Sequence, residues 1–163
     1  MGSLHERNIS LWIGTTPETT YPPLSGEVTV DVAVIGAGIT GLSTAALLKR
    51  AGARVAVIEA GRVASGVTGY TTAKVSSLHG LTYASLEKRL GPDAARTYGE
   101  ANQSGIAEIA RLVTELAIDC DFERLPAFTY TEEAEQVASV EAEVDAARRA
   151  GLAASFTSET DLP

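Results

Sequence analysis

The sequence predicts an α/β fold with a parallel sheet, and three observations carry this prediction. A short apolar run at 30–35 ends at a glycine, apolar residues recur at helical spacing from Ile39 to Ala51, and a second apolar run covers 54–59. Strand, glycine turn, helix and strand thus follow one another within about 30 residues, which is the pattern of a βαβ unit. Because the crossover of such a unit is right-handed, its two strands lie parallel.

The first strand and the helix have compositions that suit their places in this unit. The run at 30–35 is almost entirely apolar and predicts a strand buried on both faces by helices. Lys49 and Arg50 fall in the last turn of the helix, where the negative end of the helix dipole favours cations. Gly52 follows, and glycine commonly ends a helix because it adopts a left-handed backbone without strain.

The regions around this unit carry weaker patterns. Residues 1–27 lack periodicity and contain Tyr-Pro-Pro, so we expect an extended arm that Trp12 anchors. Residues 60–80 are rich in Gly, Ser and Thr and predict a loop with one helical turn. Further helices are expected over 82–90, over 92–118, and from Thr131 as N-cap to Gly151 just beyond the end. Strands are expected at 122–131, despite Pro126, and at 152–157.

Composition and charge exclude several classes of function. The chain has 163 residues, 45% hydrophobic and 21% charged, as is typical of a folded protein. Its formal net charge of -8 disfavours nucleic acid and anionic membrane surfaces as partners.

A single cysteine, Cys120, and no Cys/His pair at metal-ligand spacing predict an intracellular protein without a structural metal. No apolar stretch is long enough for a bilayer and Glu6 interrupts any signal peptide, so we expect a cytoplasmic location.

The motif G-x-G-x-x-G at 36–41 directly follows the first strand and opens the helix. Gly36 permits the tight turn, Gly38 lets a diphosphate approach the backbone, and Gly41 lets the helix lie close to the strand. The helix N-terminus offers free N–H groups and the positive end of its dipole to that diphosphate. The motif predicts a dinucleotide-binding, Rossmann-like domain.

An acidic residue completes the pattern. Glu59 ends the second strand, about 20 residues after the motif, where a carboxylate accepts hydrogen bonds from the ribose hydroxyls of an adenosine and repels a 2'-phosphate. NADP is therefore disfavoured, whereas FAD and NAD both contain ADP and stay open. A P-loop is excluded because Leu42 stands where its lysine is needed.

The small-residue loop after Glu59, EAGRVASGVTG, resembles the flavoprotein pattern in which this loop runs along the diphosphate toward the flavin. The chain as a whole resembles the N-terminal part of the D-amino-acid oxidase and glycine oxidase family of FAD-dependent oxidoreductases. Ser-Leu-Trp near the start, Tyr-Pro-Pro before the first strand and Cys-Asp-Phe at 120–122 carry this resemblance. Thr-Thr-Ala-Lys at 71–74 and Leu-His-Gly at 78–80 resemble the subgroup that often has a C-terminal Rieske domain.

The resemblance implies FAD as cofactor and an amine or amino acid as substrate, oxidised by hydride transfer to the flavin. The electron acceptor would be oxygen or a Rieske centre beyond this chain. An NAD-dependent dehydrogenase and a non-catalytic dinucleotide-binding fragment are the alternatives. The residues that the motif and the resemblance assign to the cofactor are Gly36, Ala37, Gly38, Ile39, Thr40, Gly41, Glu59, Ala60, Gly61, Arg62, Ser65, Gly66, Thr68, Thr71, Thr72, Ala73 and Lys74.

Family members are at least twice as long, so the resemblance implies an incomplete set of domains. We expect an arm at 1–27, the N-terminal portion of an FAD-binding domain at 28–118, and the beginning of an α+β substrate domain at 119–163. No catalytic side chain is nominated. Lys74 either stabilises negative charge on reduced flavin or is an exposed lysine of a solvated loop, and His79 is either a cofactor contact or base or, as is more common, a hydrogen-bonded structural residue. The acidic neighbours of Cys120 disfavour a nucleophilic thiol.

Overall fold

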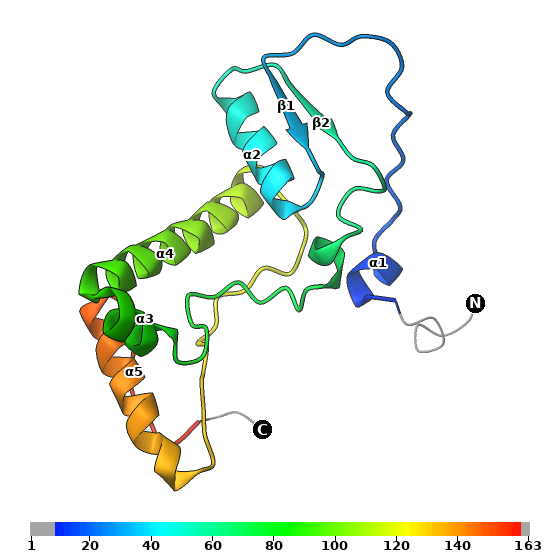
Figure 1. Cartoon of the computed structure of the whole chain (residues 1–163). Coiled ribbons are helices and arrows are strands. Elements are labelled where there is room, and N and C mark those ends of the chain that lie inside the picture. Colours follow the sequence, from blue (N-terminus) through cyan, green and yellow to red (C-terminus); the bar gives the residue numbers. More distant parts are fainter. Residues whose placement is uncertain (1–8, 161–163) are drawn as a thin grey trace. The chain divides into compact units, whose positions relative to one another are not determined.

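The computed structural model describes residues 9–160 (Figure 1). The chain forms two compact units, of which the first ends at Lys74 and the second begins at Val75. Each unit has its own internal packing, and each is described by itself below.

The first unit contains the predicted βαβ arrangement. Strand β1 (Val32–Ile35) leads into helix α2 (Ile39–Arg50), and strand β2 (Val55–Ile58) follows. The two strands pair in parallel with Val32 opposite Val55, and α2 contacts both of them (Figure 1). The predicted parallel arrangement is therefore confirmed.

The prediction that the first strand is buried on both faces is wrong for the described residues. Burial alternates along β1, with Val32 and Val34 partly covered and Ala33 and Ile35 exposed. Ile35 retains 78% of its accessible surface. The reason is that α2 is the helix that packs on this sheet within the unit, and one helix covers one face.

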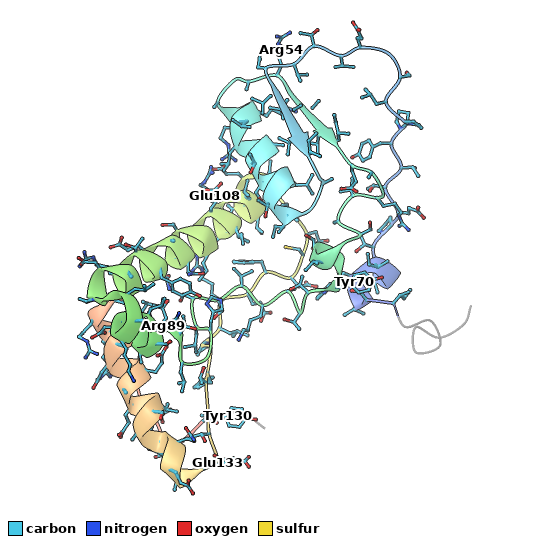
Figure 2. All side chains as sticks on the ribbon, in the orientation of Figure 1. Arg54, Tyr70, Arg89, Glu108, Tyr130 and Glu133 are labelled. Carbon is cyan, nitrogen blue, oxygen red and sulfur yellow. The ribbon has the colours of Figure 1, made fainter. Side chains whose placement is uncertain are left out.

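Local interactions fix the end of the βαβ unit where α2 ends and the two strands begin. Gly52 has a φ of 91° just after α2, so glycine supplies the left-handed backbone that the turn requires. At the amino ends of the strands, the Arg54 guanidinium donates to the Asp31 carboxylate, with Nη2 and Oδ1 2.8 Å apart, and labelled Arg54 marks this end in Figure 2. The side-chain bond to Arg54 lowers the pKa of Asp31.

The arm before the sheet is not uniformly extended. It contains a single short helix among the described residues, α1 (Leu11–Thr15), and otherwise runs without helix or strand to β1. Trp12 anchors it as predicted, because its indole Nε1 donates to the carbonyl oxygen of Thr71 at 2.7 Å. The loop after β2 has the predicted helical turn, the 3-10 helix η2 (Val67–Tyr70).

The second unit is helical. Helix α3 (Thr82–Leu90), helix α4 (Pro92–Glu115) and helix α5 (Val137–Arg149) pack on one another, and the 3-10 helix η3 (Ala134–Gln136) precedes α5. Gly91, with a φ of 87°, makes the turn between α3 and α4. The buried core consists of Tyr83, Ala95, Ala146, Ala147 and Ala150.

A buried carboxylate joins two helices of this unit. Glu143 of α5 is only 4% exposed, and its two carboxylate oxygens accept hydrogen bonds from the backbone N–H groups of Tyr83 and Ala84, each at 2.7 Å. These N–H groups lie in the first turn of α3, where a helix has no acceptor of its own. Glu143 therefore caps α3 from another helix.

Two predicted strands are wrong. Among the described residues, neither 122–131 nor 152–157 forms a strand. A strand needs a neighbouring strand to take up its backbone hydrogen bonds, and the sheet of the described residues consists of β1 and β2. Tyr130, labelled in Figure 2, remains 76% exposed. The third predicted helix begins at Val137 rather than after Thr131, whose hydroxyl instead accepts from Glu133 N in a local turn.

In the part of the chain that the structure describes, no helix combines the length and the apolar character that a membrane crossing requires.

Candidate cofactor site

The glycine-rich turn lies at the carboxyl ends of the two strands. Gly36 donates its N–H to the carbonyl of Ile58 at 2.7 Å and then turns with a φ of 98°, a conformation that an L-residue rarely adopts. Ala37 follows and is only 1% exposed. Its N–H donates to Glu59 Oε2 at 2.8 Å, and its carbonyl accepts from Ala64 N at 2.9 Å.

The N-terminus of α2 presents backbone donors beside this turn. Gly38 is the N-cap, and its carbonyl accepts the first helical hydrogen bond, from Leu42 N at 2.9 Å. The Thr68 hydroxyl accepts from Ile39 N at 3.0 Å. Within residues 9–160, the N–H groups of Gly38 and Thr40 have no acceptor. Free donors at the positive end of a helix dipole form a site for an anion.

Gly41 brings the helix and the turn together. A Cβ built on Gly41 would lie 2.0 Å from the carbonyl oxygen of Gly36 and 3.3 Å from Cγ1 of Val34. Any side chain at Gly41 would therefore force α2 away from β1. This close approach is the role that the sequence predicts for the third glycine of the motif.

Glu59 closes the site from the end of β2. Its Oε2 accepts from Ala37 N and its Oε1 accepts from Gly61 N, both at 2.8 Å. The hydrogen bond from Ala37, followed by that from Gly61, lowers the pKa of the Glu59 carboxyl below its usual value. The carboxylate is thus held ionised, and since each oxygen has two lone pairs it can accept further hydrogen bonds from a ligand.

The stability of the first unit should depend on pH through Glu59. A carboxyl with a lowered pKa in the folded state stabilises that state when ionised. This contribution is full above the ordinary value of 4.5 and is lost as the pH falls through the lower folded value. We expect Glu59→Gln to be less stable than the parent at pH 7, and this gap to close as the pH falls below 4.5.

The measurement is thermal unfolding of parent and variant from pH 7 to pH 3. Asp31 contributes to the parent's pH dependence in the same direction, because its pKa is also lowered, so only the difference between the two proteins reports on Glu59. A gap that is constant over the whole range would show that the two hydrogen bonds to Glu59 do not depend on its charge.

The loop from Arg62 to Lys74 continues from Glu59. Ser65 donates its hydroxyl to the Arg62 carbonyl at 2.8 Å, and Gly66 is the N-cap of η2, which carries Thr68. Thr71 accepts from Trp12 through its carbonyl.

A model of the FAD dependent oxidoreductase family matches residues 31–162. The chain belongs to this family. Its match includes the glycine-rich turn, Glu59 and the loop that follows, so the site described above lies inside the matched region. FAD is the cofactor of the family.

Curated relatives agree with this membership. The chain is 36% identical over 152 residues to YhfW of Bacillus subtilis, described as a Rieske 2Fe-2S iron-sulfur protein, with 93% of this chain and 30% of YhfW covered. It is 34% identical over 102 residues to gamma-glutamylputrescine oxidoreductase of Escherichia coli, with 63% and 24% covered. The oxidoreductase OrdL of Rhizobium meliloti is 30% identical over 114 residues, with 69% and 27% covered.

The chain thus spans about a third or less of the length of these relatives. No solved structure matches it.

The structure brings together most, but not all, of the residues that the sequence assigns to FAD. Residues 36–41, Glu59, Gly61 and Thr68 are linked by the contacts given above. Ala60 and Arg62 are exposed beside them. No hydrogen bond among the described residues joins 71–74 to the glycine-rich turn, and Thr72 and Lys74 are exposed.

Two residues of this site were not indicated by the sequence. Cδ1 of Ile13 would lie 2.6 Å from a Cβ on Gly69, and Glu18 pairs with Arg62, with Oε1 and Nε 3.1 Å apart. Both belong to the arm, which has no periodicity from which a contact could be predicted. In the structure Gly69 is buried, and Ile13 lies against it.

The remaining residues that the sequence analysis considered for a functional role lie outside the first unit or at its end. His79 and Cys120 belong to the second unit, and Lys74 is the last residue of the first. His79 Nδ1 and the Tyr98 hydroxyl are 2.7 Å apart, and the two rings meet edge to face. This contact supports the structural interpretation of His79. Cys120 is exposed. The described residues contain no group of acidic, His and Cys side chains that could hold a metal ion.

The residues of the first unit fit the ADP part of FAD. Gly36 and Gly38 have no side chains, and a Cβ on Gly36 would meet nothing within 4 Å, so space is open in front of the backbone at Gly36. Free N–H groups suit the diphosphate, and the ionised Glu59 suits the ribose hydroxyls.

Proposed function

We propose that this chain holds FAD through residues 36–41, Glu59 and the 60–74 loop in an enzyme that oxidises an amine or an amino acid. The observation that carries the proposal is the contact of Glu59 with the glycine-rich turn. It brings a carboxylate and the glycine-rich turn together at the carboxyl edge of a parallel sheet, which supports a ribose acceptor beside a diphosphate site. Bound FAD would supply the hydride acceptor for the substrate.

Each group of this chain has a defined task in binding. The N–H groups of Gly38 and Thr40 donate to diphosphate oxygens at the start of α2. The Glu59 carboxylate accepts from the ribose, and its bonds to Ala37 and Gly61 orient it for this contact. The Thr68 hydroxyl, which accepts a hydrogen bond from Ile39 N at the start of α2, adds a polar group beside the diphosphate.

The choice of substrate class is supported by the relatives. One of them is a gamma-glutamylputrescine oxidoreductase and two are named as oxidoreductases OrdL. For the electron acceptor we propose oxygen or a Rieske centre outside these residues, the latter supported by the likeness to YhfW. The proposed organisation is an arm at 1–27, part of the FAD-binding domain at 28–118, and the start of a substrate domain at 119–163.

The test is a titration of the chain with FAD, followed by flavin fluorescence and by equilibrium dialysis. We expect FAD to bind with one site per chain and to be displaced by ADP, because the proposed contacts are made to the ADP part. NAD contains the same ADP part and should also compete, so tighter binding of FAD than of NAD is the result that favours a flavoprotein. A chain that binds NAD but not FAD would favour an NAD-dependent dehydrogenase, and binding of neither would overturn the assignment of the site.

A further inference from the structure

Residues 12–18 of the arm contact the loop after β2 at three points. The Trp12 indole N–H donates to the Thr71 carbonyl at 2.7 Å, and Glu18 pairs with Arg62 at 3.1 Å. Between these two points, Ile13 lies against Gly69 so closely that a Cβ there would be 2.6 Å from its Cδ1. Figure 2 labels Tyr70, in this same stretch, beside α1.

The same loop also contacts the glycine-rich turn. Ala64 donates its N–H to the Ala37 carbonyl at 2.9 Å, and Thr68 accepts from Ile39 N at 3.0 Å. The loop is therefore held between the arm and the turn. Ala64 has a φ of 56° and Ala73 a φ of 60°, a left-handed backbone that is costly for alanine and persists only where surrounding contacts impose it.

The arm adds little to the packing of the unit. Helix α1 contains no buried residue, and Trp12 is 40% exposed. The contacts of the arm with the loop are therefore surface contacts and do not form part of a buried core. Loss of one such contact should change the conformation of the loop more than the stability of the βαβ unit.

We propose that residues 12–18 are a positioning strap, which holds the 62–74 loop in the conformation that receives FAD. The proposal rests on the proposed function, since it takes the loop to be part of the FAD site. The proposed role of the strap is exerted on the loop. It acts through Thr71, Gly69 and Arg62, and its effect is to place Thr68 and Ala64 against the glycine-rich turn before the cofactor binds.

The test compares Trp12→Phe with the parent. Phenylalanine keeps an aromatic ring and removes the N–H donor to Thr71. We expect the affinity for FAD to fall by about three- to tenfold, as for the loss of one hydrogen bond. Hydrogen exchange of the 62–74 amides should become faster, while exchange in β1 and α2 stays the same. Trp12→Phe combined with Glu18→Gln should weaken binding further.

The matched control is Leu11→Ala, because Leu11 is 56% exposed on the same short helix and lies outside the strap. It should change neither FAD affinity nor loop exchange. Unchanged exchange and unchanged affinity in Trp12→Phe would overturn the strap. If the parent itself fails to bind FAD, the proposed function fails, whereas the exchange data still decide whether the strap holds the loop.

Discussion

Gly41→Ala should destabilise the first unit by about 3 kcal/mol, because the new methyl group has no space and the obstacle is backbone. The Cβ would lie 2.0 Å from the Gly36 carbonyl oxygen, so α2 must move away from β1. This movement also disturbs the turn that precedes the helix. We therefore expect FAD binding to be lost together with stability.

Chemical denaturation followed by tryptophan fluorescence measures this loss, since Trp12 is the only tryptophan of the chain and lies in the same unit. The control is Gly105→Ala, at an exposed helical glycine of α4 whose Cβ would meet nothing within 4 Å. Denaturation of Gly105→Ala followed by circular dichroism should show a stabilisation of about 0.5–1 kcal/mol. A Gly41→Ala variant as stable as the parent would mean that α2 and β1 are not as close as described.

Gly38→Val should abolish FAD binding while leaving the helix content intact. Gly38 has a φ of -81°, which valine adopts readily. Its Cβ would lie 3.2 Å from the Thr68 hydroxyl oxygen, the end of a side chain that can move. The fold therefore tolerates the change, but the branched side chain fills the space in front of the N–H groups that are proposed to bind the diphosphate.

Equilibrium dialysis with FAD and circular dichroism of the same samples separate the two effects. Gly38→Ala should give an intermediate affinity, because its single methyl group requires only a small shift of Thr68. Gly105→Ala should bind FAD like the parent. Retention of FAD by Gly38→Val would place the diphosphate elsewhere. Together with Gly41→Ala, the variant distinguishes a glycine needed for the fold from one needed for the ligand.

The sequence by itself determined the βαβ unit and its turn. Apolar periodicity, Gly52 and the glycine-rich motif act through contacts between near neighbours, so the strands at 32–35 and 55–58 and the helix between them could be predicted closely. The helical turn at 67–70 and the helix at 82–90 have the same local origin. The approach of Gly41 to Gly36 could also be predicted, since both lie in one short motif.

Only the tertiary structure decided the contacts between distant segments. The cap that Glu143 provides for α3 and the contact of Ile13 with Gly69 each join residues far apart in sequence, and no local pattern specifies such a partner. The same reason explains the two wrong strands. The segments at 122–131 and 152–157 have suitable composition, but a strand is stabilised by a neighbour that accepts and donates its backbone hydrogen bonds, and the described residues supply none there.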